Sequence, residues 1–317
     1  MDKGIVYGKS VFVGTRVFLK NISPLNNRTE MPKALFVIKK LLAFGLCYWA
    51  GLLLGEGAVI GLHFACGKNV FRGEMFGFTE STLIQYYGYI IPIAAVLFYW
   101  RHIEKRRLRE MGITKNIGGW FKGAALGAAL LAACVGAVTL TGSIKFAGFP
   151  EKPDIPMLVM FFFGFVIQGA YEEILCRGLM LRSLGDKVPF PAALAANTLV
   201  FTCPHLGALT EGEPKYVLTG ILCLISISCL FTFLTVRTGS IWAACGLHSI
   251  WNFGLYCILG LDLSGMDEIS VSLINMRAAG ESLLNGGKYG IESSIITAAV
   301  ITAFAAVIGI TKERKVG

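Results

Sequence analysis

Residues 157–181 read MLVMFFFGFVIQGAYEEILCRGLML, an apolar run with two adjacent glutamates and one arginine in its second half. A run of about 20 apolar residues can cross the hydrocarbon core of a bilayer as a helix. Ionisable side chains inside such a helix are costly, so they mark functional candidates. This stretch therefore predicts a membrane-spanning fold and places a candidate site within it.

The whole chain has the same character. It contains 317 residues, of which 55% are hydrophobic and 15% charged, and its mean hydropathy is +0.64. Helices are expected because a lipid-exposed backbone must satisfy its own hydrogen bonds. The predicted fold is an all-α, polytopic membrane bundle of about eight transmembrane helices. The eight apolar runs are 41–64, 83–100, 123–140, 157–181, 190–206, 217–236, 241–261 and 291–310.

The runs predict one transmembrane domain over residues 41–311, with its catalytic core at about 157–260. A basic cytoplasmic segment, 1–40, precedes this domain, and a cytoplasmic tail, 312–317, follows it. Of the 29 Lys and Arg residues, 22 lie on the side that holds both termini. Since basic residues mark the cytoplasmic side, we expect both termini to be cytoplasmic, in a bacterial cytoplasmic membrane.

The net charge of +9 is spread over short segments between apolar runs. A nucleic-acid partner is therefore not expected, and the lipid bilayer is the expected surroundings. Glycines at 119, 123 and 127 repeat at a spacing that allows two membrane helices to approach closely. We expect these glycines to serve helix packing.

The polar residues of 157–181 can be assigned from helix geometry. Glu173 and Arg177 are four residues apart and share a helix face, in the favourable order for an ion pair. Glu172 points about 100° away from Glu173 around the helix. The geometry predicts that Arg177 neutralises Glu173 as structural support, while Glu172 faces another element.

Two other runs supply polar groups at a similar depth. Phe201 and His205 are four residues apart, and so are His248 and Asn252. Counted at about 1.5 Å per residue, these groups and Glu172 fall in the middle of the bilayer. Three helices would thus bring their polar groups to one level.

These groups support a limited chemistry. A carboxylate beside a histidine can orient and deprotonate water. A second histidine with an asparagine can stabilise the oxyanion that forms when water attacks a carbonyl. Pro204 lacks a backbone donor and is expected to kink its helix beside His205. Hydrolysis of an amide bond within the membrane is the natural inference.

Three motifs, in order on separate runs, resemble those of the CPBP intramembrane proteases. This family includes type II CAAX prenyl endopeptidases and bacteriocin-processing or self-immunity proteins. The resemblance covers about residues 157–260. The motifs are Glu172-Glu173-x-x-x-Arg177, Phe201-x-x-x-His205 and His248-x-x-x-Asn252.

The resemblance implies an endopeptidase of glutamic or metallo type that acts on a membrane-associated peptide or protein. Within it, Glu172 would activate water together with His205. His248 and Asn252 would form an oxyanion hole. No cofactor is expected; the alternative is zinc, for which Glu172, His205 and His248 would be the ligands.

Two other function classes stay open. A protein of the same fold could sequester a peptide without cleaving it, as an immunity protein would, and a proton-coupled transporter could use the buried acids. Phe201 and Trp251 are expected along the substrate path. The roles of Glu56 and His63, the substrate and the oligomeric state are not determined by the sequence.

Overall fold

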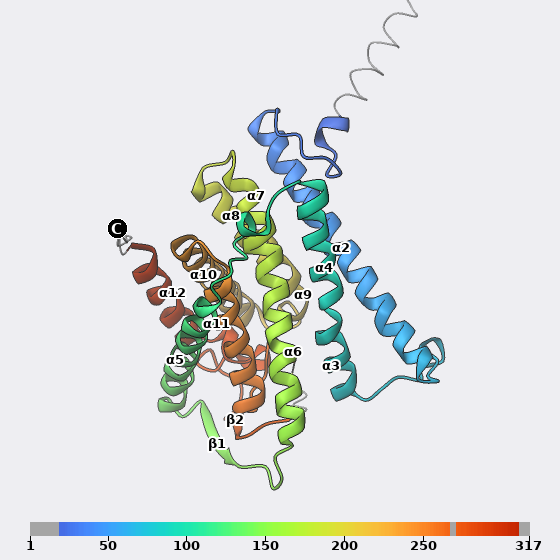
Figure 1. The fold of residues 1–317 in the computed structure, drawn as a ribbon. Coiled ribbons are helices and arrows are strands. Elements are labelled where there is room, and N and C mark those ends of the chain that lie inside the picture. Colours follow the sequence, from blue (N-terminus) through green and yellow to red (C-terminus); the bar gives the residue numbers. More distant parts are fainter. Residues whose placement is uncertain (1–18, 267–270, 311–317) are drawn as a thin grey trace, which may run out of the picture.

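The computed structural model describes residues 19–266 and 271–310 (Figure 1). About half of the expected basic segment 1–40 and the whole tail 312–317 lie outside the described residues. Each of the eight apolar runs corresponds to a helical segment. The helices are α2 (Lys33–Ala65), α3 (Phe78–Gly88), α4 (Ile90–Phe98), α5 (Gly118–Leu140), α6 (Ile155–Glu173), α7 (Arg182–Gly185), α8 (Phe190–Thr202), α9 (Leu206–Leu209), α10 (Pro214–Thr238), α11 (Trp242–Phe253) and α12 (Ile295–Ile310).

Six helical segments in the described part of the chain are long and apolar enough to cross a membrane. Helix α12 is apolar but shorter, and α11 with the turn that follows it is also shorter than the six. The helical, polytopic membrane fold is confirmed, whereas the number of eight crossings stays a prediction. The six segments are Lys33–Ala65, Phe78–Ile103, Gly118–Leu140, Ile155–Gly185, Phe190–Leu209 and Pro214–Thr238.

Helices α6 and α11 lie in the middle of the bundle, with α5, α10 and α12 on one side and α2 to α4 on the other (Figure 1). Both central helices change to π-helical geometry near their polar residues, at η4 (Ile174–Leu181) and η6 (Gly254–Ile258). Such π-helical turns occur frequently at functional sites.

Helices α5 and α11 pack in backbone contact. A Cβ atom at Gly123 would lie 1.9 Å from the carbonyl oxygen of Ala243, and one at Gly127 would lie 2.7 Å from that of Leu247. On the facing helix, a Cβ at Gly246 would lie 2.0 Å from the Trp120 carbonyl oxygen. The expected packing role is therefore seen for two of the three spaced glycines.

A two-stranded antiparallel sheet closes one end of the bundle, a feature that the apolar runs do not predict. Strand β1 (Ile144–Gly148) follows α5, and β2 (Asn275–Ala278) follows the α11 segment. Ile144 pairs with Ala278, and a bulge separates Phe146 from Gly148. The sheet joins the two connections that leave α5 and α11.

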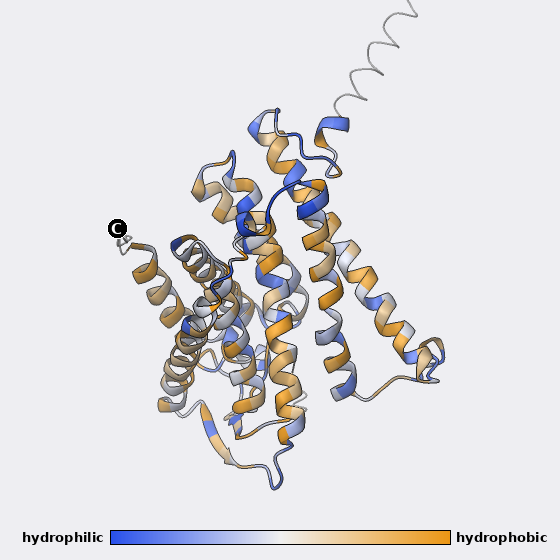
Figure 2. Cartoon of the chain, viewed as in Figure 1, coloured by the Kyte–Doolittle hydropathy of each residue, from blue (hydrophilic) through white to orange (hydrophobic). Residues whose placement is uncertain are grey.

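Polar connections gather at the opposite end (Figure 2). Arg106 contacts Asp186 across two connections, with 2.5 Å between Nη1 and Oδ2. The buried Lys40 Nζ lies 2.7 Å from a carboxylate oxygen of Glu104. The basic connections thus share one end of the bundle, and its cytoplasmic placement stays a prediction.

Candidate active site

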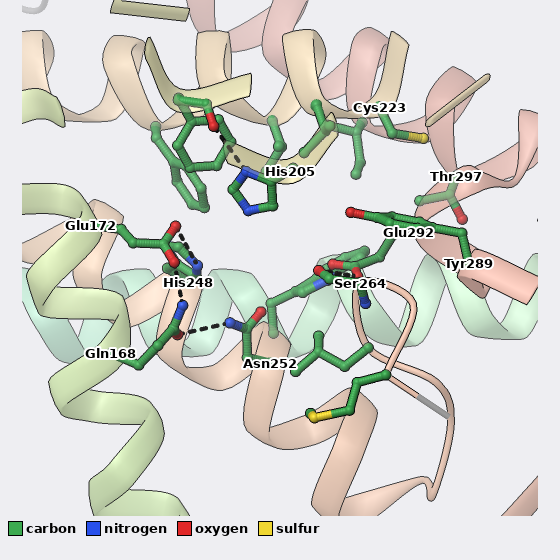
Figure 3. A pocket seen from close by; sticks show the side chains of 18 of the residues that line it. Gln168, Glu172, His205, Cys223, His248, Asn252, Ser264, Tyr289, Glu292 and Thr297 are labelled. Atoms are coloured by element: carbon green, nitrogen blue, oxygen red, sulfur yellow. Dashed lines mark hydrogen bonds and ion pairs between the residues drawn. The ribbon is translucent and has the colours of Figure 1, made fainter. Parts of the chain in front are cut away.

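A cavity of about 410 Å³ lies among the polar residues of α6, η5 (Cys203–His205) and α11 (Figure 3). Glu172, His205, His248 and Asn252 all line it. The structure therefore brings together the four residues that the sequence analysis placed at one depth. Helix α10 and the segment around η8 (Ile291–Ser293) complete the wall.

The two adjacent glutamates have different surroundings. The side chain of Glu172 is 23% exposed and faces the cavity, whereas that of Glu173 is fully buried. Glu173 Oε1 lies 3.0 Å from Nη1 of Arg177, whose side chain is also fully buried. This is the division that the helical geometry predicts.

The buried ion pair also reaches His248. Its Nδ1 atom lies 3.1 Å from Oε1 of Glu173, and its Nε2 atom lies 3.9 Å from Oε2 of Glu172. A carboxylate accepts hydrogen bonds and does not donate them, so Nδ1 donates to Glu173. The imidazole is thereby fixed, with Nε2 toward Glu172.

Two phenylalanines enclose the guanidinium of Arg177. The rings of Phe201 and Phe231 lie 4.5 and 4.9 Å from its central carbon. Nη2 donates to the hydroxyl and the carbonyl oxygen of Ser228 at 3.0 and 3.2 Å. Phe231 also stacks on the ring of His248, with 5.0 Å between centroids. Ring contacts and hydrogen bonds thus hold the charge in an interior position.

His205 follows the helix break at Pro204. Helix α8 ends at Thr202, and η5 continues as a 3-10 turn, as expected where a proline interrupts the backbone hydrogen bonds. Nδ1 of His205 lies 2.8 Å from the carbonyl oxygen of Phe201. A carbonyl oxygen can only accept, so Nδ1 carries the proton and Nε2 of the neutral ring is an acceptor.

Gln168 was missed by the sequence analysis. Its Nε2 atom donates to Oε1 of Glu172 at 2.5 Å, and its Oε1 atom accepts from Nδ2 of Asn252 at 2.9 Å. The amide thus links the two residues across α6 and α11. Its position four residues before Glu172, on the same helix face, was the available signal.

A second cavity, of about 220 Å³, adjoins the first. Glu172, Phe201 and His205 line both. The remaining lining residues are mainly aromatic or aliphatic, and Tyr48 and Tyr171 are among them. The polar residues thus lie between two spaces, the second of which is largely apolar.

Three further residues singled out by the sequence also have defined places. Trp251 lines the first cavity and donates from Nε1 to Oε1 of Glu292 at 3.0 Å. His63 donates from Nδ1 to the carbonyl oxygen of Val59, and its Nε2 atom accepts from the backbone N–H of Phe76. These bonds fix the connection after α2. Glu56 lines a separate space of only about 30 Å³. His63 and Glu56 thus lie outside the candidate active site.

The zinc alternative stays a prediction, and its three expected ligands can be placed in the structure. Among residues 19–266 and 271–310, no group of three or more His, Cys, Asp or Glu side chains could hold a metal ion. Glu172, His205 and His248 share the cavity, but they do not converge on one such point.

Comparison with known proteins supplies a family for this region. Residues 154–254 match a family model described as Type II CAAX prenyl endopeptidase Rce1-like. Neither the curated proteins nor the solved structures gave a match. The matched segment contains all three motifs and therefore confirms the resemblance to the CPBP intramembrane proteases. Over residues 154–254, about a third of its length, this chain is similar to the Rce1-like type II CAAX prenyl endopeptidases.

Proposed function

We propose that this protein is an intramembrane endopeptidase that hydrolyses a peptide bond in a membrane-associated protein or peptide. The family match supports a protease at the family level, and the apolar helices support an integral membrane protein. The observation that carries the proposal is the single cavity that Glu172, His205 and His248 line from three helical segments.

In the proposed reaction, Glu172 and His205 orient and deprotonate a water molecule. The Glu172 carboxylate and Nε2 of His205 are acceptors at the cavity wall, as a general base requires. The water oxygen bonds to the substrate carbonyl carbon, and charge moves to the carbonyl oxygen. Collapse of this intermediate breaks the C–N bond. The proton taken from water passes to the leaving amine, which leaves a carboxylic acid and an amine as products.

His248 and Asn252 are the proposed donors to the oxyanion. Asn252 gives one N–H to Gln168 and has a second for the substrate. An imidazole that is protonated on both nitrogens can donate from Nε2 while Nδ1 holds Glu173. Donors fixed before the reaction stabilise developing charge most effectively.

The remaining residues support this site. Glu173 and Arg177 position His248 through the buried network, and we assign them no direct contact with substrate. Phe201 and Trp251 line the cavity and are proposed to contact the substrate. Because the zinc ligands do not converge, we propose that catalysis needs no metal. We also propose a bacterial cytoplasmic membrane with both termini cytoplasmic.

A comparison of peptides in membranes tests the function. Cells that produce the wild-type protein or the Glu172→Gln variant are compared by mass spectrometry of membrane-associated peptides. We expect cleavage products that require Glu172 and His205 and that persist in a Glu56→Gln control. Products that are identical in the wild type and Glu172→Gln would exclude proteolysis at this site. A peptide held equally by both proteins and cleaved by neither would support the immunity alternative.

A further inference from the structure

A second carboxylate, that of Glu292, lies across the cavity from Glu172 (Figure 3). It belongs to η8, outside the segment that matches the family model. Oε1 accepts from Nε1 of Trp251 at 3.0 Å. Oε2 accepts from the backbone N–H and the hydroxyl of Ser264 at 2.7 and 2.9 Å. A carboxylate has about four acceptor positions, so Glu292 is held in place and retains capacity for one more donor.

The charges around the cavity are unbalanced. Glu172 and Glu292 both line it, whereas no Lys or Arg does so among the described residues. A His248 ring protonated on both nitrogens balances one of these two carboxylates and leaves the other uncompensated. Arg177 is fully buried and already bonded to Glu173. A cavity lined by acids in apolar surroundings favours a positively charged occupant and disfavours an anion.

Two buried hydroxyls lie beside Glu292 in the cavity wall (Figure 3). Tyr289 is 5% exposed and Thr297 is 0% exposed, and both line the same cavity. Neither hydroxyl oxygen has a partner at ordinary hydrogen-bond geometry among the described residues, although Tyr289 lies near Ser264 and Thr297 near Cys134. A buried polar group without a partner is costly. Both hydroxyl oxygens are buried in the cavity wall, so a polar group that enters must displace neighbouring atoms slightly to reach them.

We propose that Glu292 is a specificity-determining residue that receives a positively charged side chain of the substrate, Lys or Arg. This inference rests on the proposed function. An ammonium group has three donors and no acceptor, which matches the free position on Glu292 and the oxygens of Tyr289 and Thr297. An acidic substrate residue at this position would meet Glu292 and be rejected.

Binding of designed peptides tests this inference without requiring cleavage. The probes are capped, otherwise apolar heptapeptides with one Lys, norleucine or Glu placed at each position in turn. They are titrated onto the Glu172→Gln protein in lipid nanodiscs, with empty nanodiscs as the blank. At one position, we expect the Lys peptide to bind about ten-fold more tightly than the norleucine peptide, the effect of one charged hydrogen bond. The Glu peptide should bind most weakly.

Additional substitutions locate the effect. Adding Glu292→Gln should abolish the preference for Lys, whereas adding Glu213→Gln, an exposed acid paired with Lys215, should preserve it. The comparison of Lys and norleucine peptides needs no variant of Glu292, so it tests the proposal even where Glu292→Gln fails to fold. Equal binding of these peptides at every position, or no binding of either, would overturn it. A preference that survives Glu292→Gln would overturn it too.

Cleavage by the protein with Glu172 intact separates the two proposals. Cleavage with no preference for a basic residue would contradict the role of Glu292 alone. Lys-dependent binding without any cleavage would contradict the protease assignment alone. An equal loss of cleavage for all peptides in Glu292→Gln would contradict the specificity role. It would indicate that Glu292 only positions Trp251 through their hydrogen bond.

Discussion

Nδ1 of His248 lies 3.1 Å from Oε1 of Glu173, so a wholly buried carboxylate orients an imidazole at the cavity wall. The same oxygen atom of Glu173 accepts from Arg177. Helix α6 therefore supplies both the carboxylate that lines the cavity, Glu172, and the carboxylate that orients His248, Glu173. Support and chemistry are divided between two neighbouring residues.

The first prediction follows from this division. Glu172→Gln should abolish cleavage and leave the protein folded. Glu173→Gln and Arg177→Ala should lower both cleavage and stability, because the loss of one buried partner leaves an uncompensated charge that costs about 3 to 5 kcal/mol. Thermal unfolding in detergent measures the stability, and product formation measures the activity.

A surface pair on the same chain provides the control for this experiment. Arg106 and Glu110 are also four residues apart, but their side chains are 20% and 40% exposed. Glu110→Gln should cost less than about 1 kcal/mol, as exposed pairs do. Equal stability of the Glu172, Glu173 and Arg177 variants would contradict the proposed division.

Helix geometry explains why this part of the site could be predicted. The four-residue spacing of Glu173 and Arg177 fixes one face, and the neighbouring Glu172 must then point elsewhere. Membrane depth likewise placed His205 and His248 at one level. Both arguments use only distances along a helix, which the sequence contains.

Other parts of the site depend on contacts between distant segments. Phe231 reads as one more apolar residue of its helix, yet it packs on both Arg177 and His248. Glu292 precedes α12 and lines the cavity because the tertiary fold brings this segment beside α11. The pairing of Ile144 with Ala278 is equally non-local. None of these has a periodic signal.

The second prediction concerns the amide chain between Asn252 and Glu172. Asn252→Ala should lower turnover by about 10² to 10³-fold, the usual effect of losing an oxyanion donor, with substrate binding retained.

Gln168→Leu removes one hydrogen bond to a charged group and should lower kcat by about 10- to 100-fold with little change in KM. Steady-state kinetics on one peptide separates kcat from KM. An unchanged kcat for Gln168→Leu would show that this amide does not position Glu172.

The third prediction tests the contact between α5 and α11. In Gly123→Ala, the new methyl group would meet the Ala243 carbonyl oxygen, so the helices must separate. Overpacking of this kind costs about 1 to 3 kcal/mol. Gly136→Ala is the matched control on the same helix, because a Cβ there has nothing within 4 Å. Equal unfolding temperatures for Gly123→Ala and Gly136→Ala would contradict the close contact of α5 and α11 at Gly123.

The fourth prediction concerns membrane orientation. Reporters inserted after Lys105 and at the C-terminus should both report the cytoplasm, since the basic connections share one side. A reporter after Glu281, close to β2, should report the other side. Opposite results at all three positions would invert the orientation. The same side for Glu281 and the C-terminus would remove the crossing assigned to α12.

The last prediction separates water activation by Glu172 and His205 from activation by a metal. The described residues offer no three-donor metal group, and Nδ1 of His205 is already bonded to a backbone carbonyl. Extensive chelation of the purified protein should therefore leave turnover unchanged, and added zinc should not raise it. Loss of activity on chelation, with recovery at one equivalent of zinc, would instead make Glu172, His205 and His248 ligands of a rearranged site. Asn252 would then orient a ligand rather than an oxyanion, so Asn252→Ala would weaken zinc binding. Metal content measured for the wild type and Asn252→Ala distinguishes these two outcomes.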